Sequence, residues 1–337
     1  MRLPLALATT LLAGTSLAGG AAAAPPDVVA TIQPIHSLAA GVMAGVAEPV
    51  LLVPAGNSPH SFQMKPSQAA ALQGADVVFW VGEALETFLE KPLATLGRDT
   101  VVVELLEAPG VTLLKPREGG AWEPHEHDEA AADEHDHDHD HDHDHAEAAA
   151  EVDHDHDHGH GHEEVDAHIW LGPDNARAIV RAMAGALGEV DAANAARYRA
   201  NADAVVARID ALEAELRQEL APVQAKPFIV LHDAYAYFEQ AFGLNAAGSI
   251  TVSPDRPPGA QRLAELRAKI EQQDATCVFA EPQASPELVT TLVDGTGAGV
   301  GTLDPEGSTA IPTGPDAWFT LMRGNAKELV TCLSRSS

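Results

Sequence analysis

Cysteine is scarce in this 337-residue chain, which has only Cys277 and Cys332. No cysteine lies near the N-terminal apolar segment, so the sequence excludes a lipid attached through an N-terminal cysteine. An isolated pair in an exported protein predicts one disulfide, here tying the C-terminal tail to a predicted strand. Two unrelated free thiols are the alternative.

Long apolar runs are also lacking beyond the N-terminus. No later run reaches the roughly 18 to 20 residues that a membrane-spanning helix needs. At the N-terminus, Arg2 precedes an apolar stretch over about residues 3–17 and then small residues before Pro25. This layout predicts a signal peptide over residues 1–23, cleaved near Ala23, and hence an exported, soluble protein of the periplasm.

Basic residues are few, and the formal net charge is −30. Residues 118–166 hold 20 acidic side chains and no lysine or arginine, so the rest of the chain carries only about −10. A protein that binds nucleic acid needs a basic face, and the sequence shows none. We therefore expect no nucleic-acid partner.

What the chain does contain is a repeated rhythm of short apolar runs. Runs rich in valine and isoleucine predict strands buried on both faces, and the helical patterns between them predict parallel βαβ units. The predicted strands cover 27–32, 49–54, 75–82 and 100–105, then 226–233, 246–252, 276–281 and 299–304. The fold class is therefore α/β, with one lobe over 24–172 and another over 226–337.

A helical segment, 173–225, joins the two lobes. It opens with a helix over about 173–187. A second pattern over about 191–220 places apolar residues three and four apart among many charges, which predicts an amphipathic helix of about 30 residues and about 45 Å. Such a helix can run along both lobes as a strut.

A low-complexity segment over 117–166 interrupts the first lobe. It contains the runs EHDHDHDHDHDH and DHDHDHGHGH, and its dense like charge and few apolar residues predict disorder. Its two runs carry eleven histidines: His135, His137, His139, His141, His143, His145, His154, His156, His158, His160 and His162. We expect this loop to bind several metal ions weakly, as an accessory collector or sensor. A solvated tether is the alternative.

Outside that loop the chain has only four histidines. His60, His168 and His232 each stand at a strand end or just before a helix, as does Asp304. Ligands of open α/β sheets bind beyond the carboxyl ends of the strands, so these four residues can converge on one cleft. Three imidazoles and one carboxylate suit a tetrahedral Zn²⁺ site. The fourth histidine, His36, fits a helix cap or a second-layer position as well.

At these residues the chain resembles the zinc-binding subunits of ABC-type uptake systems, within the metal-specific solute-binding protein family. The resemblance rests on PHSFQMKPSQAAALQGADVVFWVGEALETFLEKP, DAHIWLGPDNAR, VLHDAYAYFEQAFGL, PGAQRLAELR, ATCVFAEPQ and GTLDP, which span both lobes. It implies two lobes bridged by a long helix, a metal site between the lobes, a membrane permease as partner and a monomeric state.

The resemblance also implies roles for single residues. His60, His168 and His232 match the three histidine ligands, Asp304 matches a fourth ligand of several relatives, and Cys277 and Cys332 match a disulfide. Pro59 stands where some zinc-binding members have a glutamate at the site, so the fourth ligand stays open between Asp304, water and a histidine of the run.

Further alternatives concern the metal, the role of Glu281 and the class of function. Glu at the third ligand position is typical of manganese-binding members, so His232 favours Zn²⁺, the softer cation, over manganese or broad divalent binding. Glu281, at a strand end, is expected to orient a ligand imidazole, with a helix cap or ion pair as its alternative.

A zinc hydrolase would need a general base, and no HExxH motif is present, so we expect no enzyme. A metal store that uses the His run alone is the remaining alternative.

Overall fold

The computed structural model describes residues 24–117, 122, 165–251, 258–272, 275–283 and 286–335. The expected signal peptide over 1–23 and nearly all of the His/Asp-rich loop, with its eleven histidines, lie outside the described residues. No helix in the described part of the chain has both the length and the apolar character that crossing a membrane requires.

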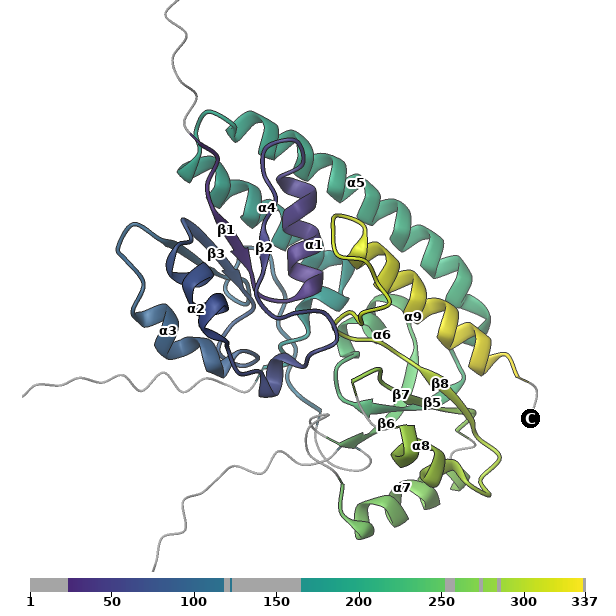
Figure 1. Cartoon of the computed structure of the whole chain (residues 1–337). Coiled ribbons are helices and arrows are strands. Elements are labelled where there is room, and N and C mark those ends of the chain that lie inside the picture. The colour runs from purple at the N-terminus through teal and green to yellow at the C-terminus, as the bar shows by residue number, and fades with distance from the viewer. Residues whose placement is uncertain are drawn as a thin grey trace, which may run out of the picture.

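The first lobe is built on a four-stranded parallel sheet (Figure 1). Its strands are β1 (Val28–Ala30), β2 (Val50–Leu51), β3 (Val77–Trp80) and β4 (Val101–Glu104), in the order β2-β1-β3-β4. Val29 pairs with Val50, and Val28 with Val77. The chain moves to one side of β1 and then returns to the other, so the strand order reverses between β1 and β3.

The second lobe repeats this topology. Its strands are β5 (Pro227–His232), β6 (Asn245–Thr251), β7 (Cys277–Ala280) and β8 (Gly299–Thr302), all parallel and in the order β6-β5-β7-β8. Here the order reverses between β5 and β7. All eight strands predicted from the sequence are present, and the predicted α/β class with parallel sheets is confirmed.

Helices cover both faces of each sheet. The inner faces meet α1 (Gln33–Val42), α4 (Pro173–Val190), α5 (Ala195–Leu220), α6 (Ala236–Phe242) and α9 (Ala317–Leu333), and the outer faces meet α2 (Pro66–Gln73), α3 (Glu90–Ala94), α7 (Ala260–Gln272) and α8 (Pro286–Val293). Side chains therefore alternate: Phe228 and Val230 of β5 join the inner core, and Ile229 joins an outer one. Burial on both faces explains why the strands are continuously apolar.

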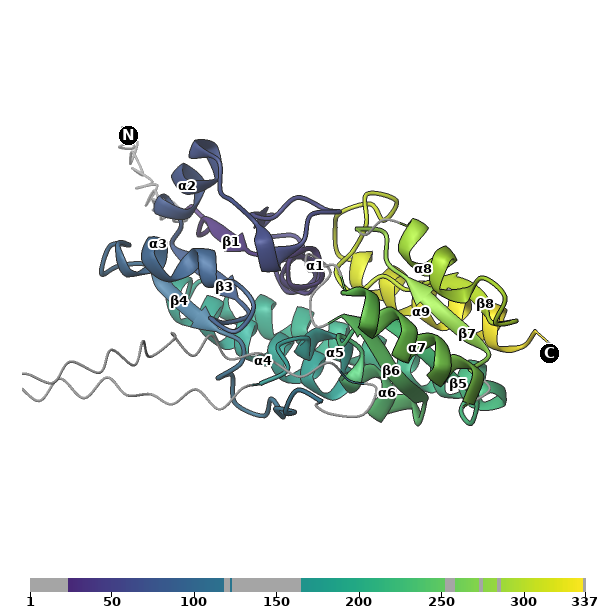
Figure 2. The ribbon, with the colours of Figure 1, turned by 90° about the horizontal axis from the view of Figure 1, so that it is seen from below.

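The predicted strut is present as α5, which runs along both lobes (Figures 1 and 2). It packs against α1 and α4 of the first lobe and α9 and α6 of the second. Its buried side chains are Tyr198, Ala202, Val205, Ile209, Leu212, Leu216 and Leu220, the apolar stripe of the sequence pattern. The helix begins at Ala195, a few residues later than predicted, because Asp191 ends α4 and accepts hydrogen bonds from Asn194.

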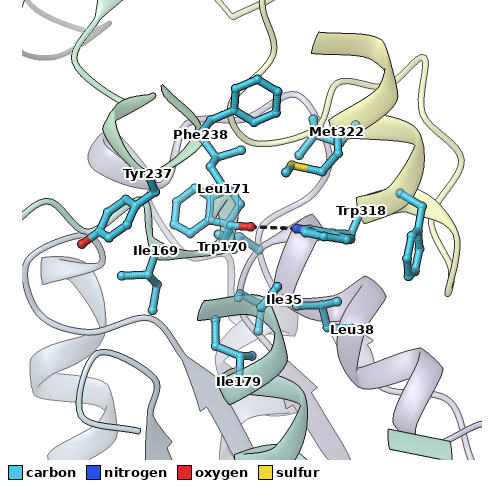
Figure 3. Packing of buried hydrophobic residues seen from close by; sticks show 14 of the residues in the cluster. Ile35, Leu38, Ile169, Trp170, Leu171, Ile179, Tyr237, Phe238, Trp318 and Met322 are labelled. Atoms are coloured by element: carbon cyan, nitrogen blue, oxygen red, sulfur yellow. Dashed lines mark hydrogen bonds between the residues drawn. The ribbon is translucent and has the colours of Figure 1, made fainter. Parts of the chain in front are cut away.

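One hydrophobic core extends through both lobes. Figure 3 shows where they meet: Trp170 and Trp318 are fully buried, and the Trp318 indole nitrogen donates to the Trp170 carbonyl at 2.8 Å. The Trp170 indole in turn donates to the Pro305 carbonyl at 2.7 Å. These contacts and the surrounding core join the lobes. A large hinge motion that separated the two lobes would therefore expose apolar surface to water.

The predicted disulfide is confirmed, since Cys277 of β7 is bonded to Cys332 of α9 across a separation of 55 residues. It fastens the last helix to the second sheet. The lobe boundaries expected from the sequence, 24–172 and 226–337, stay predictions.

Candidate metal centre

His60 is supplied by the loop that follows β2. It lies in a short 3₁₀ turn, η1 (Pro59–Ser61), which starts with a proline, and the Ser58 hydroxyl accepts a hydrogen bond from the His60 backbone at 3.3 Å. Within the described residues, the Nε2 atom of His60 is buried without a hydrogen-bond partner. A buried polar atom without a partner is costly, so this nitrogen is suited to a ligand.

His168 is supplied by the chain that leads into α4 through the 3₁₀ turn η3 (Ile169–Leu171). The carboxylate of Asp166 accepts hydrogen bonds from both the backbone nitrogen and the Nδ1 atom of His168, at 3.0 and 2.8 Å. Both side chains are buried. The imidazole is therefore fixed in orientation, with Nε2 facing away from the carboxylate.

His232 ends β5, and Glu281 directly follows β7. These strands are neighbours at the point where the order of the second sheet reverses, where open α/β sheets place their ligands. The Nδ1 atom of His232 lies 2.7 and 2.8 Å from the two carboxylate oxygens of Glu281. Glu281 therefore lies where its carboxylate can accept a hydrogen bond from the His232 ring, and the Tyr235 hydroxyl also donates to this carboxylate, at 3.4 Å.

The three histidines converge although they come from both lobes. One potential ligand atom of each lies within 4.8 Å of the others. The Nε2 atoms of His168 and His232 are 3.3 Å apart. Two nitrogens bound to one tetrahedral Zn²⁺ at about 2.0–2.1 Å would be separated by about 3.3–3.4 Å. This pair is therefore already spaced as two corners of a zinc tetrahedron.

Tautomer and charge also fit a cation. The carboxylates beside Nδ1 of His168 and His232 favour the tautomer with the proton on Nδ1, which leaves Nε2 of each ring as the potential ligand atom. Burial, and then the neighbouring imidazoles, lower the pKa of His60 well below its usual value. Burial alone would lower the pKa of His232, but Glu281, with Asp233 and Asp166, raises it. The site therefore offers imidazole nitrogens as ligands, with the carboxylates of Asp166, Asp233 and Glu281 close by to favour a cation.

Asp304, the candidate fourth ligand, lies in the loop after β8 with its carboxylate turned to the backbone. It accepts hydrogen bonds from the backbone nitrogens of Glu306, Gly307 and Ser308, at 3.2, 2.8 and 2.6 Å. It is not a member of the close group of three histidines. Glu306 of the same loop lies closer to one of these histidines: it is buried, and its Oε1 atom lies 3.9 Å from Nε2 of His60.

Gly307 shows why this loop lies so close to the first lobe. Its backbone has φ of +98°, and a Cβ atom there would lie 2.3 Å from the Gln33 side chain of α1. Its carbonyl accepts a hydrogen bond from the Gly56 nitrogen at 3.0 Å, in the loop that carries His60. The absence of a side chain therefore lets the Glu306 loop reach the His60 loop.

His36, the remaining histidine named from the sequence, lies within α1, where its Nε2 is 2.9 Å from the Pro49 carbonyl, and it is not a member of the close group of three histidines. Two further residues at the site were missed in the sequence. Asp166 and Glu306 were not singled out. Asp166 stands two residues before His168, and Glu306 two residues after Asp304, so each could have been found by inspecting the immediate neighbours of the candidate ligands.

Two α/β lobes joined by a long helix, with three converging imidazoles from both, define a solute-binding protein whose site is suited to a metal ion. The family comparison agrees and is specific. The chain belongs to the family described as zinc-uptake complex component A, periplasmic, whose model matches residues 28–332. Proteins of this family are solute-binding proteins rather than enzymes.

Curated relatives match nearly the whole chain. It is 50% identical over 332 residues to the high-affinity zinc uptake system protein ZnuA of Brucella suis, covering 98% of each chain. It is 41% identical over 313 residues to the protein of the same name from Paracoccus denitrificans, covering 91% of this chain and 92% of the relative.

Solved structures confirm the fold. A crystal structure of ZnuA superposes with a TM-score of 0.70 at 24% identity, covering 92% of this chain and 99% of that one. A zinc-bound ZnuA mutant lacking residues 138–173 of its own sequence also superposes with a TM-score of 0.70 at 24% identity, covering 93% and 100%.

Proposed function

We propose that this protein captures Zn²⁺ in the periplasm and delivers it to the membrane permease of an ABC importer. Family membership and relatives named as zinc uptake proteins support the transport role. The observation that carries the metal assignment is the 3.3 Å separation of two Nε2 atoms whose imidazoles are oriented by carboxylates. Zinc is the cargo, and His60, His168 and His232 are its proposed ligands.

Imidazole ligands favour zinc over the harder Mn²⁺, which carboxylates serve better. Cu²⁺ and Ni²⁺ would also bind such nitrogens by intrinsic affinity, so discrimination against them depends on geometry and supply. We therefore retain manganese or broad divalent binding as the alternative for the same site, to be separated by direct competition.

For the fourth ligand we propose Glu306 ahead of Asp304. The support is positional: the Glu306 carboxylate is buried 3.9 Å from His60 Nε2, whereas the Asp304 carboxylate accepts three backbone hydrogen bonds that ligation would disrupt. Asp304, water and a histidine of the run remain the alternatives for this fourth position.

The same proposal covers export, oligomeric state, the His/Asp-rich loop and the release of zinc. The chain is exported by its N-terminal segment without a lipid anchor, acts as a monomer and has no nucleic-acid partner. The His/Asp-rich loop collects or senses zinc, because many imidazoles beside carboxylates raise the local concentration of the ion. The core shared by the lobes favours release by movement of the ligand loops over wide opening of the lobes.

Calorimetric zinc titration tests the transport site. The proteins are the full exported chain, a version lacking residues 123–163, and that version with His60→Ala, His168→Ala, His232→Ala or Glu306→Gln. His36→Gln serves as the matched control, because His36 is a buried histidine whose ring contacts only the local Pro49 carbonyl among the described hydrogen bonds.

We expect the version that lacks residues 123–163 to keep one tight zinc site. We expect each of the three histidine-to-alanine changes to abolish zinc binding at that site. We also expect Mn²⁺ to compete weakly and His36→Gln to bind zinc like its parent. Loss of tight binding with residues 123–163 would move the functional site to the His run and make the chain a metal store. Equal competition by Mn²⁺ would support the broad-metal alternative.

A further inference from the structure

A buried ion cluster joins the lobes next to the three histidines. Arg117, at the end of the described chain that follows β4, places its guanidinium between two carboxylates of the second lobe. Its Nε atom lies 3.0 Å from Asp233 Oδ1, and its Nη1 atom lies 2.6 Å from Glu239 Oε2. The three side chains are 25, 11 and 8% exposed, and the Trp122 ring covers the guanidinium at 3.6 Å. Such a forked, largely desolvated contact is geometrically specific.

Tyr237 of α6 makes a second junction beside the first. Its hydroxyl donates to the Asp166 carbonyl at 2.7 Å and accepts from the Leu114 nitrogen at 3.0 Å. The Leu114 carbonyl accepts in turn from the Asp166 nitrogen at 2.9 Å. One hydroxyl of the second lobe thus holds two segments of the first, residues 111–117 and 165–168, against each other.

Both junctions lead directly to proposed ligands. Asp166, fixed through its backbone by Tyr237, orients the His168 imidazole through its carboxylate. Asp233, fixed by Arg117, is the next residue after His232. The junctions therefore act on one ligand from each lobe, and these are the two whose Nε2 atoms are 3.3 Å apart.

We propose that Arg117 and Tyr237 are positioning residues that hold the ligand of the first lobe, His168, against the ligand of the second, His232, and thereby slow zinc dissociation. This inference rests on the proposed function. The physical reason is preorganisation: the two imidazoles come from segments 64 positions apart and already lie 3.3 Å from each other, so contacts of the protein itself must hold these segments together. Without the junctions the two segments separate, and one ligand leaves the metal more readily.

Stopped-flow transfer of zinc from the full exported protein to a chelator in excess measures the dissociation rate. Tyr237→Phe removes one hydroxyl that makes two hydrogen bonds, and we expect zinc to leave about tenfold faster. Arg117→Gln removes a charge that two buried carboxylates share, and we expect a rise of about 30-fold. Arg117→Lys keeps the charge without the planar fork and should restore part of the retention.

The chain offers matched controls that take no part in either junction. Tyr198→Phe removes a buried hydroxyl that donates to Asp191 at 2.9 Å, and Arg177→Gln removes a guanidinium that contacts Asp174, Asp210 and Glu213. Thermal midpoints of the zinc-free proteins show the structural cost of each change. Visible absorption of Co²⁺ bound in place of zinc reports the ligand geometry, which a purely structural role would leave unchanged.

The inference predicts faster zinc loss and an altered Co²⁺ spectrum in the Arg117 and Tyr237 variants, with wild-type behaviour in both controls. Wild-type dissociation rates in Arg117→Gln and Tyr237→Phe, or equal acceleration in the controls, would overturn it. Those results leave the proposed function intact. Absence of a tight zinc site in the wild type, or an unchanged site in His232→Ala, would overturn the proposed function itself and this inference with it.

Discussion

Replacing Glu281 with glutamine tests how the protein tunes a ligand without touching the metal. The carboxylate lies 2.7 and 2.8 Å from Nδ1 of His232, and the two side chains are 2 and 0% exposed. Glutamine has nearly the same size and keeps one oxygen that accepts from Nδ1, so the imidazole stays in place. What is lost is the negative charge that makes the imidazole a stronger donor to a cation.

The size of the effect follows from the hydrogen bond. A bond to a charged group contributes about 1.5–3 kcal/mol and a neutral one about 0.5–1.5 kcal/mol, so the change costs about 1–1.5 kcal/mol. At 1.4 kcal/mol per factor of ten, the zinc dissociation constant should rise about tenfold. Glu281→Ala, which also frees the ring, should raise it by up to about 100-fold.

The assay is zinc competition with a chelator of known affinity, between pH 5.5 and 8. Glu213→Gln is the control, because Glu213 pairs with Arg177 and Arg217 on the surface of α5. Burial lowers the pKa of His232, and the charge of Glu281 is the largest of the effects that raise it. Its removal should therefore shift the loss of zinc at acid pH to lower values. A dissociation constant within twofold of wild type and an unmoved pH profile would refute the reasoning.

Three further predictions concern pH and stability. In the wild type, zinc affinity should fall as pH decreases, because protons compete with zinc for the imidazoles. The raised pKa of His232 makes this competition begin at a higher pH than for an ordinary imidazole, and a constant affinity between pH 5 and 7.5 would contradict the prediction. Replacing Cys277 and Cys332 together with serine opens a loop of 55 residues and should destabilise the protein by about 4 kcal/mol in denaturant unfolding, whereas an unshifted unfolding midpoint would show that the core alone fixes α9. Ile209→Ala, in the fully buried stripe of α5, should cost about 2–5 kcal/mol by the same measurement without changing zinc affinity, and a cost below about 1 kcal/mol would mean that the strut carries little of the shared core.

The candidates for the fourth ligand show where pattern-based prediction reaches its limit. Asp304 ends a strand-like segment at the expected place, but its carboxylate accepts hydrogen bonds from the next residues of its own loop. Glu306 points to His60 because Gly307 lets the loop approach α1 and the His60 loop. Only the packing of three separate segments decides which of the two carboxylates faces the imidazoles.

The sequence by itself determined the elements. Runs of buried residues set the eight strands, and the three-and-four spacing set the stripe of α5. The end of β5 placed His232 at an edge where such sheets bind ligands. These features are periodic or local, so they can be read from neighbouring residues. The pairing of Cys277 with Cys332 also followed, because the chain has no other cysteine. The expected strand before His168 is not found, because residues 165–168 have no regular structure and lead directly into η3.

Only the tertiary structure decided which side chains meet. His168 and His232 are 64 positions apart and come within 3.3 Å, and Arg117 reaches Asp233 across 116 positions. No periodicity encodes such contacts, because they depend on how the two sheets are set against α5 and on a core that both lobes share. The proposed ligands were therefore visible in the sequence, whereas the contacts that the carboxylates and the guanidinium make beside them emerged only from the fold.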